Sequence, residues 1–262
     1  MGNSIPVVLT IAGSDGSSGA GIQADLKTFS ALGVYGLTVI TAITIQNTRQ
    51  VKQIHPVSLN LLKEQLDILY ADFDISYVKI GMLATKDIAE FTLNYLKEKN
   101  SKYIIDPVLK SSSGTPLFEG NAEKIVNGAY LITPNLDEAS ILAEVKIQTI
   151  EDMEQAAKLI YNQGAQNVLL KGGHLKGDKA IDILYDGKGF EYFIADKIKT
   201  KNTHGTGCTL SSAITSYLAR GENLVISIRK AKEFLLKSMQ RAKGLNLGKG
   251  RGPLIHFEDV AQ

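Results

Sequence analysis

Runs of β-branched and apolar residues alternate along the chain with longer segments whose apolar residues recur at helical spacing. The run VVLTIAG at 7–13 predicts a buried strand, and YGLTVITAITIQ at 35–46 predicts another. Between them, a helix that Gly33 can end is predicted by apolar residues at helical spacing, which are Ile22, Leu26, Phe29 and Leu32. This alternation is typical of an α/β fold in which helices cover both faces of a mostly parallel sheet.

The same alternation continues towards the C-terminus, and it shows no repeat or linker that would divide the chain. We therefore expect a single domain over residues 1–262. Further strands are predicted at 77–82, 103–108, 130–135 and 167–173, and an antiparallel edge hairpin at 180–196. Further helices are predicted within 57–71 and 85–99, before Gly164, at about 205–220 and at about 223–243.

Charge and composition exclude several classes of partner. The 262 residues include 29 basic and 27 acidic side chains, a formal charge of +2, which is too balanced for a nucleic-acid or membrane-surface footprint. One cysteine excludes an intrachain disulfide, and the first residues lack the pattern of a signal peptide. The expected location is the cytoplasm, and the expected partner is a small molecule.

Two glycine-rich segments precede predicted helices. GSDGSSGAG at 13–21 could bring backbone N–H groups to a ligand at a helix N-terminus, but it could equally be a tight strand-to-helix turn. Its glycine order is not that of a dinucleotide-binding loop, and the chain has no GxxxxGK[ST] motif. Rossmann and P-loop functions are therefore disfavoured.

The second segment, NTHGTGCT at 202–209, contains the single cysteine, Cys208. At a helix start the N–H groups of Gly205, Thr206 and Gly207 can bind an anion, and the helix dipole can lower the pKa of the Cys208 thiol, which would make it a base or nucleophile. The alternative is that Cys208 is a small buried hydrophobe and His204 an ordinary turn residue.

Polar residues also follow other predicted strands. Asp106, Asn135 and Glu138 are candidates for a hydrated Mg²⁺ site, although Asn135 could instead cap a helix. Lys171, beside two glycines, is a candidate phosphate ligand. Because the carboxyl ends of parallel strands share one edge of a sheet, these groups together indicate phosphoryl transfer.

The motifs LTIAGSDGSSGAGIQADLKTFSALGVYGLTVITAITIQNT, KIGML, DPV, ITPNLDEA, LLKGGH and KNTHGTGCTLS resemble the hydroxymethylpyrimidine/phosphomethylpyrimidine kinases of thiamine biosynthesis. The resemblance runs from about residue 7 to GKGRGP at 248–253. It implies a three-layer α/β/α ribokinase-like fold. It also implies two successive ATP-dependent phosphorylations, first of 4-amino-5-hydroxymethyl-2-methylpyrimidine and then of its monophosphate. A homodimer is implied as well.

The resemblance assigns expected roles to individual residues. Gln46 would pair with the pyrimidine ring, and the other substrate positions would be Gly13, Asp25, Met82 and Val108. Lys171, Asn135 and Thr203 would contact ATP, Asp106 and Glu138 would organise Mg²⁺, and Cys208 would be the base within the Gly205–Gly207 turn. The common family form of the first loop is GSDPSGGAG, so Gly16 and Ser18 depart from it and leave the stiffness of the loop open.

Three other functions compete with this one. A pyridoxal kinase of the same subgroup has similar motifs, but its close members tend to carry an apolar residue at the position of Gln46, whose amide both donates and accepts hydrogen bonds. A non-catalytic binding protein would not need a base beside an anion site. A dinucleotide oxidoreductase is disfavoured because the chain has neither the glycine order of the dinucleotide-binding loop nor a clear ribose-binding acid after the second strand.

Lid segments are expected near 110–116 and 174–179.

Overall fold

A computed structural model describes residues 5–110, 114–120 and 122–257. Its centre is a sheet in the order β11-β10-β9-β8-β6-β4-β1-β2-β3. The strands are β1 (Val7–Asp15), β2 (Tyr35–Gln46), β3 (Val51–Pro56), β4 (Tyr77–Ile80), β6 (Lys102–Ile105), β8 (Leu131–Ile132), β9 (Val168–Lys171), β10 (Lys179–Tyr185) and β11 (Phe190–Asp196). The six strands from β9 to β2 are parallel, whereas β3 pairs antiparallel with β2, β10 with β9, and β11 with β10.

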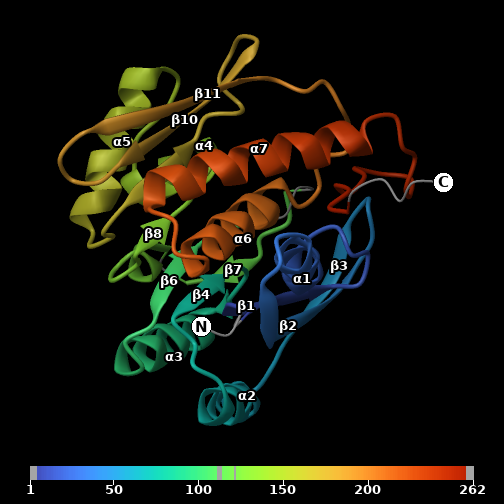
Figure 1. The fold of residues 1–262 in the computed structure, drawn as a ribbon, viewed down its shortest axis with the longest axis vertical. Helices are drawn as coiled ribbons and strands as arrows, with labels where there is room; N and C mark the ends of the chain where they lie inside the picture. The colour runs from blue at the N-terminus through green and yellow to red at the C-terminus, as the bar shows by residue number, and fades with distance from the viewer. Residues whose placement is uncertain (1–4, 111–113, 121, 258–262) are drawn as a thin grey trace.

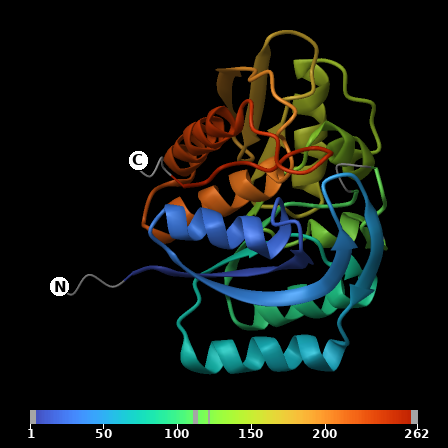
Figure 2. The same ribbon diagram turned by 90° about the vertical axis from the view of Figure 1, so that its right-hand side faces the viewer.

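Helices cover both faces of this sheet, as Figures 1 and 2 show. One face is covered by α1 (Gly21–Ala31), α6 (Thr206–Ala219) and α7 (Leu224–Ala242). The other face is covered by α2 (Leu59–Asp72), α3 (Lys86–Glu98), α4 (Leu136–Ala143) and α5 (Ile150–Asn162). The predicted three-layer α/β/α fold is confirmed by this arrangement.

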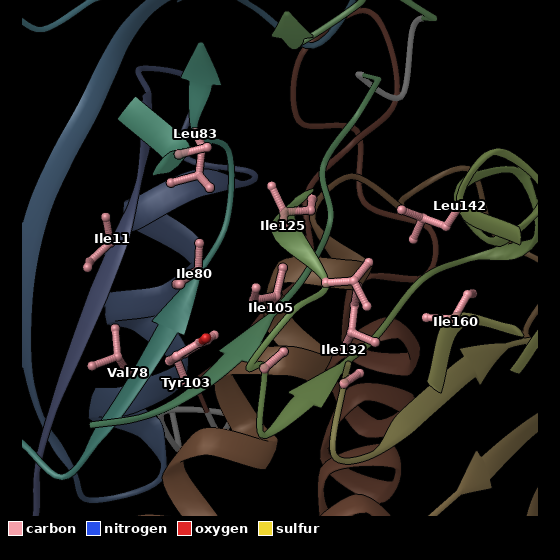
Figure 3. Packing of buried hydrophobic residues seen from close by; sticks show 14 of the residues in the cluster. Ile11, Val78, Ile80, Leu83, Tyr103, Ile105, Ile125, Ile132, Leu142 and Ile160 are labelled. Atoms are coloured by element: carbon pink, nitrogen blue, oxygen red, sulfur yellow. The ribbon is translucent and has the colours of Figure 1, made fainter. Parts of the chain in front are cut away.

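Alternation along the central strands divides the core between the two layers. In β4, Val78 and Ile80 join the cluster under α2 to α5, which Figure 3 shows from close by. Ile104 of β6 joins a separate cluster with α6 and α7. Because side chains alternate along a strand, Lys79 points to the α1 and α6 face. It is fully buried there.

The predicted hairpin at 180–196 is confirmed as β10 and β11 at one edge of the sheet. The strand β3 at the opposite edge was not predicted. Its sequence VKQIHP has no clean alternation because no residue in it is fully buried. A small sheet of β5 (Ala84–Thr85) and β7 (Phe118–Glu119), and the short 3₁₀ helix η1 (Ala122–Ile125), were also missed.

The parallel strands bring distant residues to one edge. Ile11, Ile80, Ile105 and Ile132 lie side by side on adjacent strands, in register. The chain that follows each of them therefore emerges along the same rim, which is where ligands bind in open α/β sheets. In the part of the chain that the structure describes, no helix is long and apolar enough to cross a membrane.

Candidate active site

A cavity of about 890 Å³ lies along this rim. Its wall includes nearly all the residues that the sequence singled out: Gly13, Gln46, Met82, Asp106, Val108, Asn135, Glu138, Lys171, Thr203, Gly205, Thr206, Gly207 and Cys208. The order of the strands in the sheet determines the order of these residues along the cavity. The groups from β1, β2 and β4 lie towards one end, those following β6 lie in the middle, and those from β9 and β10 lie towards the other end.

The start of α6 depends on close backbone approach to the first loop. Gly205 caps the helix with a φ of 86°, a left-handed conformation that disfavours other residues. A Cβ at Gly205 would lie 1.8 Å from the carbonyl oxygen of Gly19, and one at Gly207 would lie 2.9 Å from Oδ2 of Asp106. Glycine is therefore required at Gly205 for both conformation and space, and at Gly207 for space beside the carboxylate.

Cys208 follows in the first turn of α6 and is 8% exposed to solvent. The expectation that the helix N-terminus lowers the pKa of its thiol is wrong for the free enzyme. Burial raises the pKa of Cys208 to about 12, although the nearby Lys79 ammonium lowers it. Desolvation of the thiolate outweighs the favourable charge and dipole, so the resting group is a protonated thiol.

Lys171 at the end of β9 forms an ionic cluster with Asp106 and Glu138, which follow β6 and β8. Nζ of Lys171 lies 2.8 Å from Oδ1 of Asp106. Burial raises the pKa of Glu138 to about 7, although Lys171 opposes that rise. For Lys171, burial lowers the pKa, but the attraction of Asp106 and Glu138 outweighs it, so the lysine remains charged.

Asn135 has a structural role that the sequence left open. Its side chain accepts a hydrogen bond from the Glu138 N–H, and Glu138 accepts one from the Asn135 N–H, which together form a capping box at the start of α4. This pair fixes the Glu138 carboxylate at the cavity wall. Asn135 lines the cavity as well.

The donor set fits a shared Mg²⁺ site rather than an all-protein cage. Asp106 and Glu138 supply two carboxylates, and the described residues hold no group of three or more histidine, cysteine or acidic side chains that could bind a metal. Mg²⁺ commonly uses one or two carboxylates, several waters and substrate phosphates. The two carboxylates of this cavity are sufficient for that mode of binding.

The first loop is organised by Asp15, which the sequence analysis did not single out. Its carboxylate accepts hydrogen bonds from the N–H groups of Gly19 and Ala20, so these two amides are used within the loop, which favours the alternative of a tight strand-to-helix turn. It also lies 2.9 Å from Nε2 of His204. Although burial raises the pKa of Asp15, the hydrogen bonds from His204 and Ser17 hold it well below its usual range. An acidic residue at the end of a strand was the available signal.

Asp25 does not line the cavity, contrary to its expected role as a substrate contact. It is fully buried and accepts hydrogen bonds from Thr10, Lys79 and Ser212. These three donors occupy the carboxylate beneath the cavity wall. Lys79 does line the cavity and was missed, although a lysine inside the apolar run YVKIGM was a signal.

The end of the cavity near β1 and β2 is mostly apolar. Met82 and Val108 pack in one cluster there, and a Cβ at Gly13 would lie 2.9 Å from Cε of Met82. Gln46 at the end of β2 is partly buried and brings an amide to this surface. The combination suits a flat, weakly polar ring that has a hydrogen-bonding edge.

The two expected lid segments flank the cavity. Residues 111–113 lie outside the described part of the chain, but Lys110 and Gly114 on either side of them line the cavity. Of the segment at 174–179, His174 lines it. Whether either segment closes over a ligand stays a prediction.

Comparison with known proteins decides the family. Residues 15–255 match the family described as phosphomethylpyrimidine kinase. The chain belongs to the phosphomethylpyrimidine kinase family. The hydroxymethylpyrimidine/phosphomethylpyrimidine kinase of Aquifex aeolicus is 45% identical over 250 residues, which cover 93% of this chain and 97% of that protein. The predicted family and the prediction of a kinase are confirmed.

Solved structures agree on the fold. A Staphylococcus aureus pyridoxal kinase in complex with AMP-PCP and pyridoxal superposes with a TM-score of 0.88 at 33% identity, covering 97% of this chain and 94% of that one. A phosphomethylpyrimidine kinase of Clostridium difficile has a TM-score of 0.79 at 40% identity, covering 90% and 100%. Both kinases share the ribokinase-like fold of this chain.

Proposed function

We propose that this family member phosphorylates 4-amino-5-hydroxymethyl-2-methylpyrimidine and then the resulting monophosphate, with ATP as donor. The observation that carries the proposal is that one cavity holds the Gly205–Cys208 turn, the Lys171 and Asp106 pair and the Gln46 amide. The first two provide an anion site and a cation. The third provides a hydrogen-bonding edge for an aminopyrimidine.

The strand order supports a direction for the two substrates. The pyrimidine ring lies near Gly13, Gln46, Met82 and Val108, at the end of the cavity formed by β1, β2 and β4. ATP approaches from the β9 and β10 end, where Lys171, Asn135 and Thr203 would contact it and apolar side chains of α7 line the wall, which are Leu235, Leu236 and Met239. The transferred phosphoryl group then passes over the middle of the rim.

The first turn of α6 would stabilise that group. The N–H groups of Gly207 and Cys208 lie in a first turn, where no intrahelical acceptor is available four residues earlier, while the Thr206 N–H donates a long hydrogen bond of 3.4 Å to the Thr203 carbonyl. Together with the helix dipole and the Lys171 ammonium, they favour the negative charge of a transferring phosphoryl group. Gly205 makes this turn possible because of its conformation.

Cys208 is proposed as the base of the first reaction. The nucleophile there is a neutral alcohol whose proton must leave, and Cys208 is the titratable side chain next to the anion-binding turn. In the second reaction the nucleophile is an ionised phosphate, which requires no base. Cys208 should therefore be needed mainly for the first phosphorylation.

Mg²⁺ is proposed as the cofactor held by Asp106 and Glu138 together with ATP phosphates. When bound, it would neutralise the phosphate charges and orient them. Lys171 already neutralises part of the Asp106 charge, and the capping box holds Glu138 in place. The protein thus presents a fixed pair of carboxylates at the middle of the rim.

The assembly and location are also proposals. We propose a single-domain protein that acts as a homodimer, supported by the exposed apolar side chains of Ile43 and Ile45 near the end of β2. The use of ATP favours a cytoplasmic location, where that donor is made and held. Light scattering coupled to size exclusion would measure the dimer, and a monomer at micromolar concentration would contradict it.

A pyridoxal kinase is the second candidate, favoured by the TM-score of 0.88 to the pyridoxal complex. The deciding experiment compares kcat/KM for the hydroxymethylpyrimidine and for pyridoxal. We expect at least a tenfold preference for the pyrimidine, and that Gln46→Leu removes most of this preference. A preference of the unmodified enzyme for pyridoxal would overturn the proposed substrate.

The base role is tested by assaying the two phosphorylations separately with Cys208→Ala. We expect the first rate to fall at least a hundredfold, within the usual contribution of general base catalysis of about 10²–10⁴. The second rate should change less than threefold. Equal losses in both steps would count against a base.

A further inference from the structure

Beneath the cavity, Lys79 and Asp25 form an ion pair that is completely buried. Nζ of Lys79 lies 2.9 Å from Oδ2 of Asp25, and both side chains have no solvent exposure. Replacing such a pair by apolar residues is often neutral or stabilising, because desolvation of two charges offsets their attraction. Stability alone therefore does not account for this pair.

The pair is held in one orientation by the surrounding elements. Oγ1 of Thr10 lies 2.6 Å from Oδ2 of Asp25, and Oγ of Ser212 lies 2.7 Å from Oδ1. Ser212 is one helical turn after Cys208 on α6. The same carboxylate thus fixes the lysine of β4 and anchors the helix that carries the cysteine.

The Lys79 ammonium acts on Cys208. Both residues line the cavity, and Lys79 exerts the largest charge effect on the thiol, in the direction that favours the thiolate. The N–H of Gly21 at the start of α1 acts in the same direction. The other charged groups that interact with Cys208 are Asp25 and Asp106, which oppose the thiolate, and Lys171, which supports it.

We propose that Lys79, oriented by Asp25, is a positioning residue for Cys208. Its positive charge favours the thiolate form of Cys208, which accepts the proton of the substrate hydroxymethyl group. This inference rests on the proposed base role of Cys208. The Cys208 thiol first loses its proton to water. In the first reaction the substrate O–H bond then breaks, and an S–H bond forms on the resulting thiolate. The oxygen electron pair forms the new bond to phosphorus, the bond between the β- and γ-phosphoryl groups breaks, and ADP leaves. The thiol then returns its proton to water.

Lys79 suits this task because its charge is permanent. Burial lowers its pKa, but the charge of Asp25 outweighs that effect and raises the pKa above the usual value. Nζ of Lys79 donates a hydrogen bond to Asp25, which holds the ammonium in place.

The test uses the single cysteine of the chain, since its alkylation reports the thiolate directly. Iodoacetamide reacts with the full-length enzyme, without ligands, over a range of pH. Asp25→Asn alone would let burial lower the pKa of Lys79, so the variant that tests the charge is Lys79→Met in the Asp25→Asn background, which removes both charges without leaving an unpaired one. Since Lys79 has a larger charge effect on the thiol than Asp25, alkylation of this double variant at pH 8 should slow at least threefold relative to the unmodified enzyme.

Kinetics of the two phosphorylations complete the test. The double variant should lose at least tenfold in kcat of the first step, with KM changed less than threefold and the second step nearly unaffected. An alkylation rate of the double variant equal to that of the unmodified enzyme, or equal losses in both phosphorylations, would overturn the inference. If the unmodified enzyme fails to phosphorylate the pyrimidine, the proposed function fails instead, and the alkylation rates still report the charge effect separately.

Discussion

Gly205→Ala tests whether close approach of the α6 turn to the first loop is what assembles the site. An added Cβ would lie 1.8 Å from the carbonyl oxygen of Gly19, where an ordinary contact needs about 3.5 Å. One of the two backbones must therefore move by roughly 1.5 Å. That movement would disturb the hydrogen bond between Gly19 and Asp15 and the contact of Asp15 with His204.

Gly221→Ala at the other end of α6 is the matched control. Gly221 has a φ of 87°, nearly that of Gly205, and nothing lies within 4 Å of its added Cβ. Both substitutions share the cost of a left-handed alanine, about 1–2 kcal/mol, but only Gly205→Ala adds the clash. The comparison isolates the effect of displacement at the site.

We expect Gly221→Ala to lower the melting temperature by about 2–6 °C and to leave kcat/KM within twofold. Gly205→Ala should lower kcat/KM at least a hundredfold, because misplacing catalytic groups by about 1 Å costs about that factor. Circular dichroism confirms that both variants are folded at the assay temperature. A folded Gly205→Ala enzyme with kcat/KM within threefold of Gly221→Ala would refute the reasoning.

Two further predictions concern pH and the first loop. Because the pKa of Glu138 is raised to about 7, its carboxylate loses a proton as pH rises through 7, so the apparent affinity for Mg²⁺ should fall about tenfold from pH 8 to pH 6 and should lose this dependence in Glu138→Gln. The raised pKa also makes stability depend on pH. The protonated carboxyl of Glu138 contributes stability below the pKa that it has in the unfolded chain, and this contribution is lost as pH rises through 7. The melting temperature of the ligand-free enzyme should therefore fall over this range. Ser18 has a φ of 61°, a left-handed conformation that favours glycine, so Ser18→Gly should raise the melting temperature by about 1–3 °C. The control Glu144→Gly, at a φ of 54°, should do the same. A lower melting temperature of Ser18→Gly would contradict this prediction.

Local patterns in the sequence predicted most of the fold. The strand at 35–46 and the helices that Gly221 and Gly244 follow were predicted nearly to the residue, because hydrophobic period and glycine stops are local signals. β3 was missed because an exposed edge strand need not alternate. The cavity residues were found largely from their place after strands, and their roles came from family resemblance.

The remaining features depend on contacts between distant residues. The sequence by itself determined the layer order, the glycine turn before Cys208 and the polar groups of the rim, since each follows from short-range spacing. Tertiary structure decided that Asp25 lies beneath the cavity with Lys79, and that Asp15 joins the first loop to His204. It also decided that burial raises the pKa of the Cys208 thiol, because desolvation depends on everything packed around a group, and no local pattern contains that information.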